Sequence, residues 1–256
     1  MTLTAPRVDT PTAISLRGVS KAFGHGGSAV VALEGIDLEV ARGEFVCLVG
    51  ASGCGKSTSL NLIAGLDRPT IGDVSVSGRT ALMFQEAALF PWLTVRDNVA
   101  LPMRLTGKSR AERHRRADEL LDRVHLGGQG GRRPQELSGG MRQRAALARA
   151  LAQDAEILLM DEPFGALDAM TRDLLHDELE EVWSSTGLTI VFVTHNVREA
   201  ARLSDRSVLL TSLPGKVADQ FPVAIDRPRR IDSPEVMGLA ASVTDRLRAE
   251  VRRHGD

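Results

Sequence analysis

Residues 44–66, EFVCLVGASGCGKSTSLNLIAGL, decide the fold. The apolar run at 45–49 predicts a short buried strand, and the apolar residues Leu60 and Ile63 predict a helix after it. The turn between them, residues 50–57, has the pattern G-x-x-x-x-G-K-[ST], with a strand before it and a helix after it. An ordinary glycine turn is the alternative, but motif and context both match a phosphate-binding loop.

The residue types in this turn suit a bound phosphate group. Glycines let successive backbone N–H groups surround phosphate oxygens with no side chain in the way, and the start of the helix adds partial positive charge. Lys56 is placed to reach the β- and γ-phosphates of a nucleotide, and the Ser57 hydroxyl is placed to bind Mg²⁺. We therefore expect a nucleotide with its Mg²⁺ ion at this loop.

The bulk composition is that of a soluble globular protein. The 256 residues suffice for one large domain or two small ones, and 43% are hydrophobic and 25% charged. A net charge of −1 gives no overall basic field for nucleic acid or an anionic membrane. No apolar run approaches the roughly 18 residues of a membrane-spanning helix, so any membrane role would need a partner.

The two cysteines, Cys47 and Cys54, do not indicate a structural disulfide. Cys47 falls in the predicted strand and Cys54 in the phosphate loop, and this cysteine usage fits a reducing compartment. Cys54 is either a reactive thiol beside the nucleotide or a small side chain that fills the loop.

The chain before the phosphate loop predicts a small β layer. Residues 1–12 are polar with no long apolar segment, so we expect a disordered lead-in and no signal peptide. Residues 13–19 predict a strand, and apolar residues recur at every second position in 30–40, which is typical of antiparallel strands. Phe23, the aromatic residue of this part, either stacks on an adenine ring or packs into the fold.

Residues 90–134 predict a helical subdomain inserted into an α/β body. We expect one helix over 94–105 and another over 109–126, where apolar residues recur at helical spacing among charged ones. Pro91 and Trp92 lie in the loop before these helices. Exposed aromatic residues often anchor interactions, and the alternative is a Trp side chain folded back onto its own domain.

A pair of carboxylates follows the next predicted strand. Apolar residues 155–160 end at Asp161-Glu162. A carboxylate at the C-terminal end of a buried strand, beside a phosphate loop, suits Mg²⁺, which makes Asp161 the candidate ligand. Glu162 is the candidate base that activates water. Two adjacent acids are weak evidence alone, but the apolar run before them and the phosphate loop strengthen the prediction.

Two further sites are less specific. Ser138 is a good N-cap, and the glycines after it expose N–H groups at the start of a helix, which predicts a second anion-binding helix start. Glycine pairs at helix starts are common, so this feature is weak by itself. His195 follows a β-branched strand at 188–193, where it either senses the γ-phosphate or is structural.

The C-terminal part predicts a hairpin, a linker and a helix. Residues 208–211 and 216–221 predict the hairpin, 227–230 the linker, and 234–253 a helix with one apolar stripe. We expect this helix to pack on its own body, and a partner surface is the alternative. The expected domains are a lead-in at 1–12, a body at 13–222 and a C-terminal linker and helix at 223–256.

An ordered set of motifs resembles the nucleotide-binding subunit of ABC transporters. The phosphate loop, Gln85, LSGGM at 137–141, ILLMDEP at 157–163, residues 165–168 and His195 occur once each, in this order. LSGG is diagnostic, because generic phosphate-loop NTPases lack it. The resemblance spans about residues 14–221. It implies an α/β fold with a P-loop NTPase core of ABC type, an antiparallel β subdomain and an inserted helical subdomain.

The resemblance also implies a site completed by a second copy of the chain. Two copies would face head to tail, with ATP between the phosphate loop of one and the LSGGM motif of the other. Residue roles follow by matching motifs. The nucleotide-binding residues would be Phe23, Gly50, Ala51, Ser52, Gly53, Cys54, Gly55, Lys56, Ser57 and Thr58; the contacts across the dimer Ser138, Gly139, Gly140, Met141 and Asp168; the Mg²⁺ ligands Ser57, Gln85 and Asp161; and the catalytic residues Glu162, His195 and Gln85.

A finer resemblance points to one group of importers. Residues 84–99, Met141 and the IDRPRR segment at 225–230 resemble ATPases of nitrate, aliphatic sulfonate and taurine importers. Importers of thiamine-precursor pyrimidines and other small organic anions share much of this pattern. Residues 77–81 depart from it, because the family commonly has a longer loop there.

These resemblances imply an ATPase that drives uptake of a small anion. It would bind the cytoplasmic face of a bacterial inner membrane peripherally, as a homodimer on permease subunits served by a periplasmic or lipid-anchored binding protein. A soluble ABC ATPase acting on DNA or ribosomes is the rival, but such relatives usually carry long coiled-coil insertions or two cassettes. A regulatory module that does not hydrolyse ATP is opposed by Lys56, Asp161, Glu162 and His195.

Overall fold

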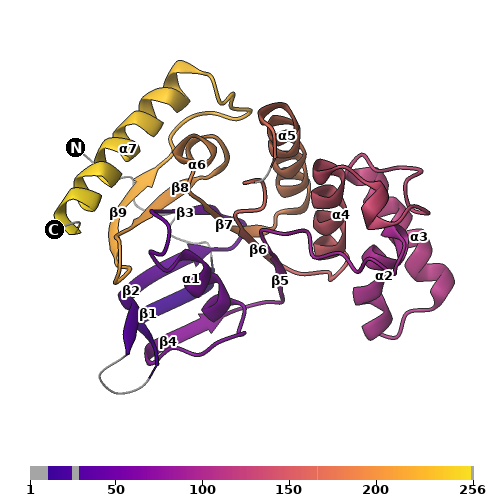
Figure 1. Ribbon diagram of the computed structural model, residues 1–256, viewed down its shortest axis with the longest axis horizontal. Coiled ribbons are helices and arrows are strands. Elements are labelled where there is room, and N and C mark those ends of the chain that lie inside the picture. The colour runs from indigo at the N-terminus through magenta and orange to yellow at the C-terminus, as the bar shows by residue number, and fades with distance from the viewer. Residues whose placement is uncertain (1–10, 25–28, 166, 255–256) are drawn as a thin grey trace.

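The computed structural model describes residues 11–24, 29–165 and 167–254. Two β-sheets form its centre, and a group of helices extends to one side, on the right of Figure 1. This confirms the predicted α/β class, with an antiparallel β layer and a helical insertion beside the main sheet.

The larger sheet has six strands in the order β5-β6-β7-β3-β8-β9. Strands β5, β6, β7, β3 and β8 run parallel, and β9 pairs antiparallel with β8 at one edge. The central strands are apolar except at some end residues, because both faces of a parallel sheet are covered. Their bounds are Phe45–Val49 (β3), Thr80–Met83 (β5), Ile157–Asp161 (β6), Thr189–Thr194 (β7), Arg206–Leu210 (β8) and Val217–Pro222 (β9).

The smaller sheet has the order β2-β1-β4, with both pairs antiparallel. Its first strand begins inside the expected disordered lead-in, because Thr12 pairs with Ala41 and the Pro11 carbonyl accepts a hydrogen bond from the Arg42 N–H. Residues 1–10 of that lead-in lie outside the described residues. The strands are Thr12–Phe23 (β1), Val30–Ala41 (β2) and Ile71–Val76 (β4).

Helix α1, Lys56–Ile63, packs between the two sheets (Figure 1). Because successive side chains of a strand point to opposite faces, β3 contributes to two cores. Phe45 and Cys47 face the core shared with the outer helices, and Val46 and Leu48 face the core under the smaller sheet. The strand that carries the phosphate loop is therefore held from both sides.

The inserted helices are α2, Val95–Leu105, and α3, Arg110–Arg123, followed by the short 3-10 helix η2, Pro134–Glu136, and α4, Gly139–Leu151. Both predicted starts are confirmed, because the Thr94 and Ser109 side chains accept hydrogen bonds from backbone N–H groups of the first turn. The predicted apolar face of α3 is buried. It comprises Ala117, Leu120, Leu121 and Val124 just beyond its end.

Three helices complete the fold: α5, Ala169–Thr186; α6, Val197–Leu203; and α7, Pro234–His254. Helix α7 contacts α6 on the side of the molecule away from the inserted helices (Figure 1). It buries Val236 and Ala240 in the main core. Within the described residues, no helix is both long enough and apolar enough to cross a membrane.

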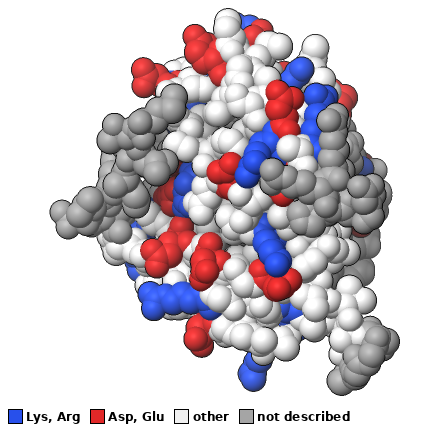
Figure 2. Space-filling view, turned by 90° about the vertical axis from the view of Figure 1, so that its left-hand side faces the viewer, with Lys and Arg blue, Asp and Glu red and all other residues white. Residues whose placement is uncertain are grey.

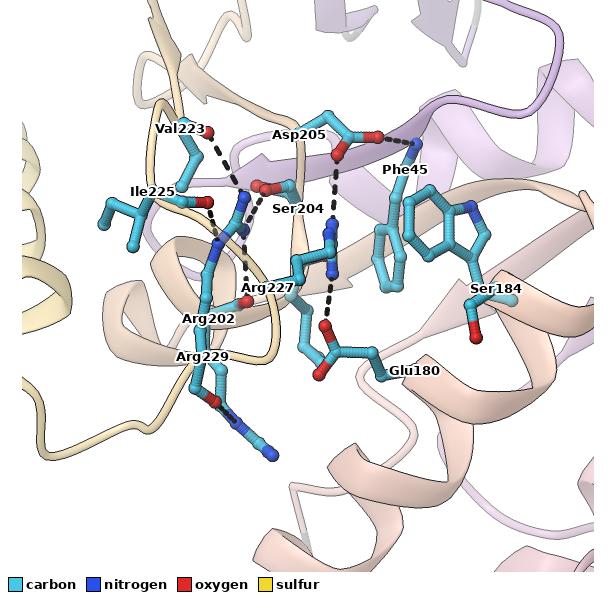
Figure 3. A network of polar contacts seen from close by, with 12 residues as sticks. Phe45, Glu180, Ser184, Arg202, Ser204, Asp205, Val223, Ile225, Arg227 and Arg229 are labelled. Carbon is cyan, nitrogen blue, oxygen red and sulfur yellow. Dashed lines mark hydrogen bonds and ion pairs between the residues drawn. The ribbon is translucent and has the colours of Figure 1, made fainter.

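A buried arginine anchors the segment that leads to α7 (Figure 3). Arg229 is 5% exposed, and its guanidinium donates hydrogen bonds to four backbone carbonyls. Burial lowers the pKa of Arg229 to about 10. The segment expected to be a linker is thus fixed to the body. The acceptors are the carbonyls of Arg202, Ser204, Val223 and Ile225.

A second arginine joins the same segment to α5 (Figure 3). Arg227 lies 2.9 Å from a Glu180 oxygen and 3.0 Å from an Asp205 oxygen, and its guanidinium carbon lies 4.3 Å from the centre of the Trp183 ring. A guanidinium stacked on an aromatic face and paired with carboxylates has little freedom. The two arginines therefore hold the C-terminal segment on α5 and α6.

Replacing Arg229 with Ala should lower the free energy of unfolding by about 2–4 kcal/mol, because several buried carbonyls lose their donor. Urea unfolding followed by circular dichroism measures the change. Arg230→Ala is the matched control, since its exposed guanidinium pairs only with the nearby Asp232 among the contacts described, and it should change stability little. Equal stability of the two variants would contradict the anchoring role.

Candidate active site

The phosphate loop connects β3 to α1 and depends on its glycines. Gly53 and Gly55 have φ values of +79° and +90°, a region that other residues rarely adopt. A Cβ atom on Gly50 would lie 2.6 Å from the Cys54 sulfur, and one on Gly55 would lie 2.4 Å from a Leu33 methyl carbon. The loop therefore requires glycine for both its backbone conformation and its close packing.

Lys56 and Cys54 lie on the inner side of this loop. The Lys56 amine donates hydrogen bonds to the Gly50 and Ala51 carbonyls at 2.9 and 3.0 Å, and its side chain is 5% exposed. Cys54 is fully buried, and burial raises the pKa of its thiol. A buried thiol of this kind behaves as a packing group, which favours the interpretation of Cys54 as a small side chain that fills the loop.

The Ser57 hydroxyl and the Asp161 carboxylate lie close to one another across the site. Burial raises the pKa of Asp161, the Ser57 hydrogen bond opposes this, and the charge of Glu162 adds to it. Both side chains offer the oxygen ligands that Mg²⁺ prefers, and Mg²⁺ usually takes one or two protein oxygens and completes its shell with phosphate and water. The oxygen donors of Ser57 and Asp161 therefore fit a Mg²⁺ ion that is bound together with a nucleotide. Within the described residues, no three or more His, Cys, Asp or Glu side chains form a cluster that could hold a metal ion.

Glu162 occupies a strained backbone position at the edge of the sheet. Its φ is 43°, in the left-handed region that is costly for a residue with a side chain. Hydrogen bonds hold it there: its N–H donates to the Val193 carbonyl at 3.0 Å, and its carbonyl accepts from the Gly165 N–H at 3.1 Å. Strain of this kind is a reason to look for function, because the surrounding structure has to enforce it.

The Glu162 carboxylate lies between a histidine and a lysine. One oxygen is 2.9 Å from His195 Nδ1, and the other is 3.8 Å from Lys56 Nζ. The Glu162 side chain is 20% exposed and the His195 side chain 61%. A carboxylate held at the mouth of a phosphate loop can accept a proton from water that attacks a terminal phosphate. The structure thus brings together Lys56, Ser57, Asp161, Glu162 and His195.

Gln85 follows β5 and is attached to α4. Its backbone carbonyl accepts a hydrogen bond of 2.8 Å from the buried Gln143 side chain. Arg149 of the same helix donates to the carbonyls of Ala87 and Ala88 at 2.9 and 2.7 Å. The Gln85 side chain is left exposed beside the site, and its loop is carried by the helix that begins at Ser138.

The LSGGM motif and Asp168 form a second group, at the contact of α4 with α5. The Ser138 hydroxyl caps α4 by accepting from the Met141 N–H, as predicted. Asp168 caps α5 by accepting from the N–H and hydroxyl of Thr171, which lowers the pKa of the Asp168 carboxyl. A Cβ atom on Gly140 would lie 2.3 Å from the Thr171 methyl group, so this glycine is also required for packing. Ala166, in the predicted 165–168 segment, lies outside the described residues.

Two predicted aromatic sites are exposed. Phe23, at the end of β1, is 47% exposed, and the Lys21 amine lies 5.0 Å from the centre of its ring. Trp92 is 67% exposed, although its ring centre is 5.2 Å from that of Phe90. The Trp92 side chain is therefore not folded into its own domain.

Asn98 holds the loop that carries Trp92, and sequence reasoning missed it. This fully buried residue of α2 accepts a hydrogen bond from the Phe90 N–H at 2.7 Å. Its amide donates to the carbonyls of Phe90 at 3.1 Å and Thr94 at 2.9 Å. Asn is rarely buried without such bonds, so an Asn on the apolar face of a predicted helix is the signal that could have revealed it.

This fold, with its phosphate loop and strand-end carboxylates, defines an ATP-binding cassette, the ATPase unit of ABC proteins. A family model described as ABC transporter matches residues 33–165, and the chain belongs to that family.

Curated relatives agree with this class. The chain is 44% identical over 229 residues to an aliphatic sulfonates import ATP-binding protein of Bacillus licheniformis, covering 86% of this chain and 89% of that protein. It is 48% identical over 229 residues to a bicarbonate transport ATP-binding protein of Synechococcus elongatus, covering 85% of this chain. The match covers only 34% of that bicarbonate relative, so the chain spans about a third of its length.

A solved structure has the same fold. It is described as a dimeric, post-hydrolysis state of an ATP-binding cassette bound to ADP and Pi. It superposes on this chain with a TM-score of 0.75 at 33% sequence identity, covering 83% of this chain and 100% of its own.

Lys56→Ala should weaken MgATP binding at least about tenfold, because a charge-assisted contact to phosphate is lost. Titration with a fluorescent ATP analogue measures the dissociation constant. Lys108→Ala is the matched control, since its amine pairs with Asp154, away from the phosphate loop. Unchanged ATP affinity of Lys56→Ala would refute the assignment of this loop.

Proposed function

We propose that this ATPase works as a homodimer that closes on two MgATP and drives uptake of a small anion through a permease. The single observation that supports a hydrolytic role is the position of the Glu162 carboxylate, which lies 2.9 Å from His195 and 3.8 Å from Lys56 at the mouth of the phosphate loop. Dimerisation and transport are argued from further features.

In the proposed mechanism the loop holds the nucleotide and Glu162 handles the proton. The backbone N–H groups of residues 50–58 and the Lys56 amine bind the β- and γ-phosphates, and the exposed Phe23 ring stacks on adenine. Glu162 accepts a proton from the attacking water, and His195 contacts the γ-phosphate and orients Glu162. Mg²⁺, when bound with ATP, neutralises phosphate charge, and its ligands would be Ser57, Asp161 and Gln85.

A dimer is supported by the separation of two anion-binding helix starts within the chain. One is the start of α1 at the phosphate loop, and the other is the start of α4 at Ser138, capped and packed on α5. The related cassette of solved structure is described as a dimer. We infer that residues 138–141 of one copy bind the γ-phosphate held by the other, with Asp168 beside them.

Contact with a permease is supported by the loop around Trp92. This loop exposes Trp92 and Phe90, and the buried Asn98 side chain holds its backbone by hydrogen bonds to Phe90. An exposed aromatic pair on a loop whose backbone is held by hydrogen bonds has the properties of an interaction anchor. We infer that a helix or loop of the permease docks on this pair, which places the chain peripherally at the cytoplasmic face of the membrane, with a binding protein acting on the permease.

The transported solute is inferred as a small anion. The two relatives described above are named for sulfonates and for bicarbonate, which share small size and negative charge. Nitrate and taurine are further members of the resembling group, and a thiamine-precursor pyrimidine is the alternative. Because the permease and binding protein recognise the solute, uptake of labelled sulfonate, nitrate and bicarbonate by cells with and without this gene distinguishes these candidates.

A role on nucleic acid is less well supported. The net charge is −1. On the face shown in Figure 2, basic and acidic side chains of the described residues are interspersed, without a broad area of one sign. A nucleic-acid-binding surface instead concentrates Lys and Arg.

Glu162→Gln should retain ATP binding and lower the hydrolysis rate by about 10²–10⁴-fold, because the amide cannot accept the proton. ATP should accumulate in a stable dimer, which size-exclusion chromatography detects. Glu181→Gln, an exposed position on α5, provides the control for loss of a negative charge. Hydrolysis near the normal rate in Glu162→Gln would remove Glu162 as the base.

Trp92→Ala should abolish ATP-driven uptake and leave the ATPase rate of the isolated chain within about twofold, because Trp92 lies outside the ATP site. Uptake by the complex reconstituted with its permease measures the effect. The control is Leu105→Ala, another exposed apolar side chain of the inserted helices, at 84% exposure. Normal uptake with Trp92→Ala would disprove the docking role.

A further inference from the structure

Glu162 and His195 line a small cavity of about 20 Å³. The cavity is also lined by Arg172 of α5 and Glu199 of α6, two charged residues that the proposed mechanism does not use. Glu199 is 4% exposed, so its burial requires polar partners.

One partner of Glu199 fixes the turn that carries His195. The Thr194 hydroxyl donates a hydrogen bond of 2.6 Å to Glu199, and the same oxygen accepts one of 2.9 Å from the Asn196 N–H. Thr194 and Asn196 are the two neighbours of His195 in the chain. The backbone on both sides of the histidine is therefore held by a single buried hydroxyl.

The other partner of Glu199 fixes the segment after Glu162. Arg172 Nε lies 3.5 Å from a Glu199 oxygen. The same guanidinium donates to the Leu167 carbonyl at 2.7 Å and to the Phe164 carbonyl at 3.3 Å. A planar guanidinium can hold several acceptors in one fixed arrangement.

The surroundings of Glu199 favour its charged form. Burial alone would raise its pKa, but contacts with His176 and Thr194 and the charge of Arg172 outweigh burial, and the pKa of Glu199 is lowered. His176 is fully buried, with Nε2 3.7 Å from Glu199 and its ring against Phe164. The buried Glu199 carboxylate therefore connects the loop after Glu162, through Arg172, with the turn that carries His195, through Thr194.

We infer that Arg172, Glu199 and Thr194 are positioning residues that hold the Glu162 loop and the His195 turn together as one unit. The inference rests on the catalytic roles proposed for Glu162 and His195. The three residues do not touch ATP in this scheme. They keep His195 Nδ1 within hydrogen-bonding distance of Glu162, and errors of about 1 Å in such geometry cost up to about 10²-fold in rate.

The test compares one Thr194 variant without the hydroxyl and one with it. Thr194→Val removes the hydroxyl and keeps the shape, and it should lower kcat for ATP hydrolysis about tenfold or more while KM for ATP stays within about twofold. Thr194→Ser restores the hydroxyl and should recover most of kcat. Glu199→Gln and Arg172→Lys should act in the same direction as Thr194→Val. This split between kcat and KM, with rescue by Ser, would not arise from a merely structural role.

Glu180→Gln is the matched control. Glu180 lies on α5 like Arg172 and pairs with Arg227, but this ion pair leads to the C-terminal segment. It should leave kcat unchanged. Melting temperatures are recorded for every variant, and if Thr194→Val does not fold, Glu199→Gln decides the question.

Two results would overturn the inference: a kcat of Thr194→Val or Glu199→Gln equal to that of the original protein, or an equal loss in Thr194→Ser and Thr194→Val. Glu162→Gln, measured in parallel, separates this inference from the proposed function. If Glu162→Gln is inactive while Thr194→Val is fully active, only the positioning network is wrong. If Glu162→Gln is fully active, the proposed base itself is wrong.

Discussion

Parallel pairing of β6, β7 and β3 is the constraint on which the rest of the structure depends. In this register Asp161 lies beside Val193, and Thr194 lies beside Val49. The three strands therefore end at one edge of the sheet, where the phosphate loop begins. Parallel strands need long connections, and these connections supply α1, the inserted helices and α5. The site is thus assembled from segments that are far apart in the sequence.

The same constraint explains why polar residues can remain buried around the site. Strand β6 is apolar up to Met160 and β7 is apolar from Ile190 to Val193, and the chain becomes polar at their last paired residues, Asp161 and Thr194. The helices that follow then carry the groups that fix those polar ends, as Glu199 does for Thr194 and Gln143 for Gln85. Apolar packing stabilises the sheet and its helices, and a few buried hydrogen bonds align the polar residues at the strand ends.

Secondary-structure elements and motifs could be predicted from the sequence, whereas strand order and the tertiary contacts of buried polar side chains could not. The phosphate loop, the strands that end at Asp161 and Thr194, and the N-cap at Ser138 each have a local pattern, and the structure places them as expected. Strand order has no local pattern, because it depends on crossovers. Asn98 and Arg229 also escaped prediction, since a polar residue on a helix or in a basic linker looks solvated until tertiary contacts bury it.

Attachment of the Gln85 segment to α4 has a mechanical consequence. Gln143 and Arg149 hold this segment from the helix that begins at Ser138, and Asn98 of α2 holds the adjoining loop around Trp92. The aromatic pair and helix α4 are therefore connected through hydrogen bonds. If a partner docks on Trp92 as proposed, these hydrogen bonds form a direct connection from the docking loop to the helix that begins at the LSGGM motif.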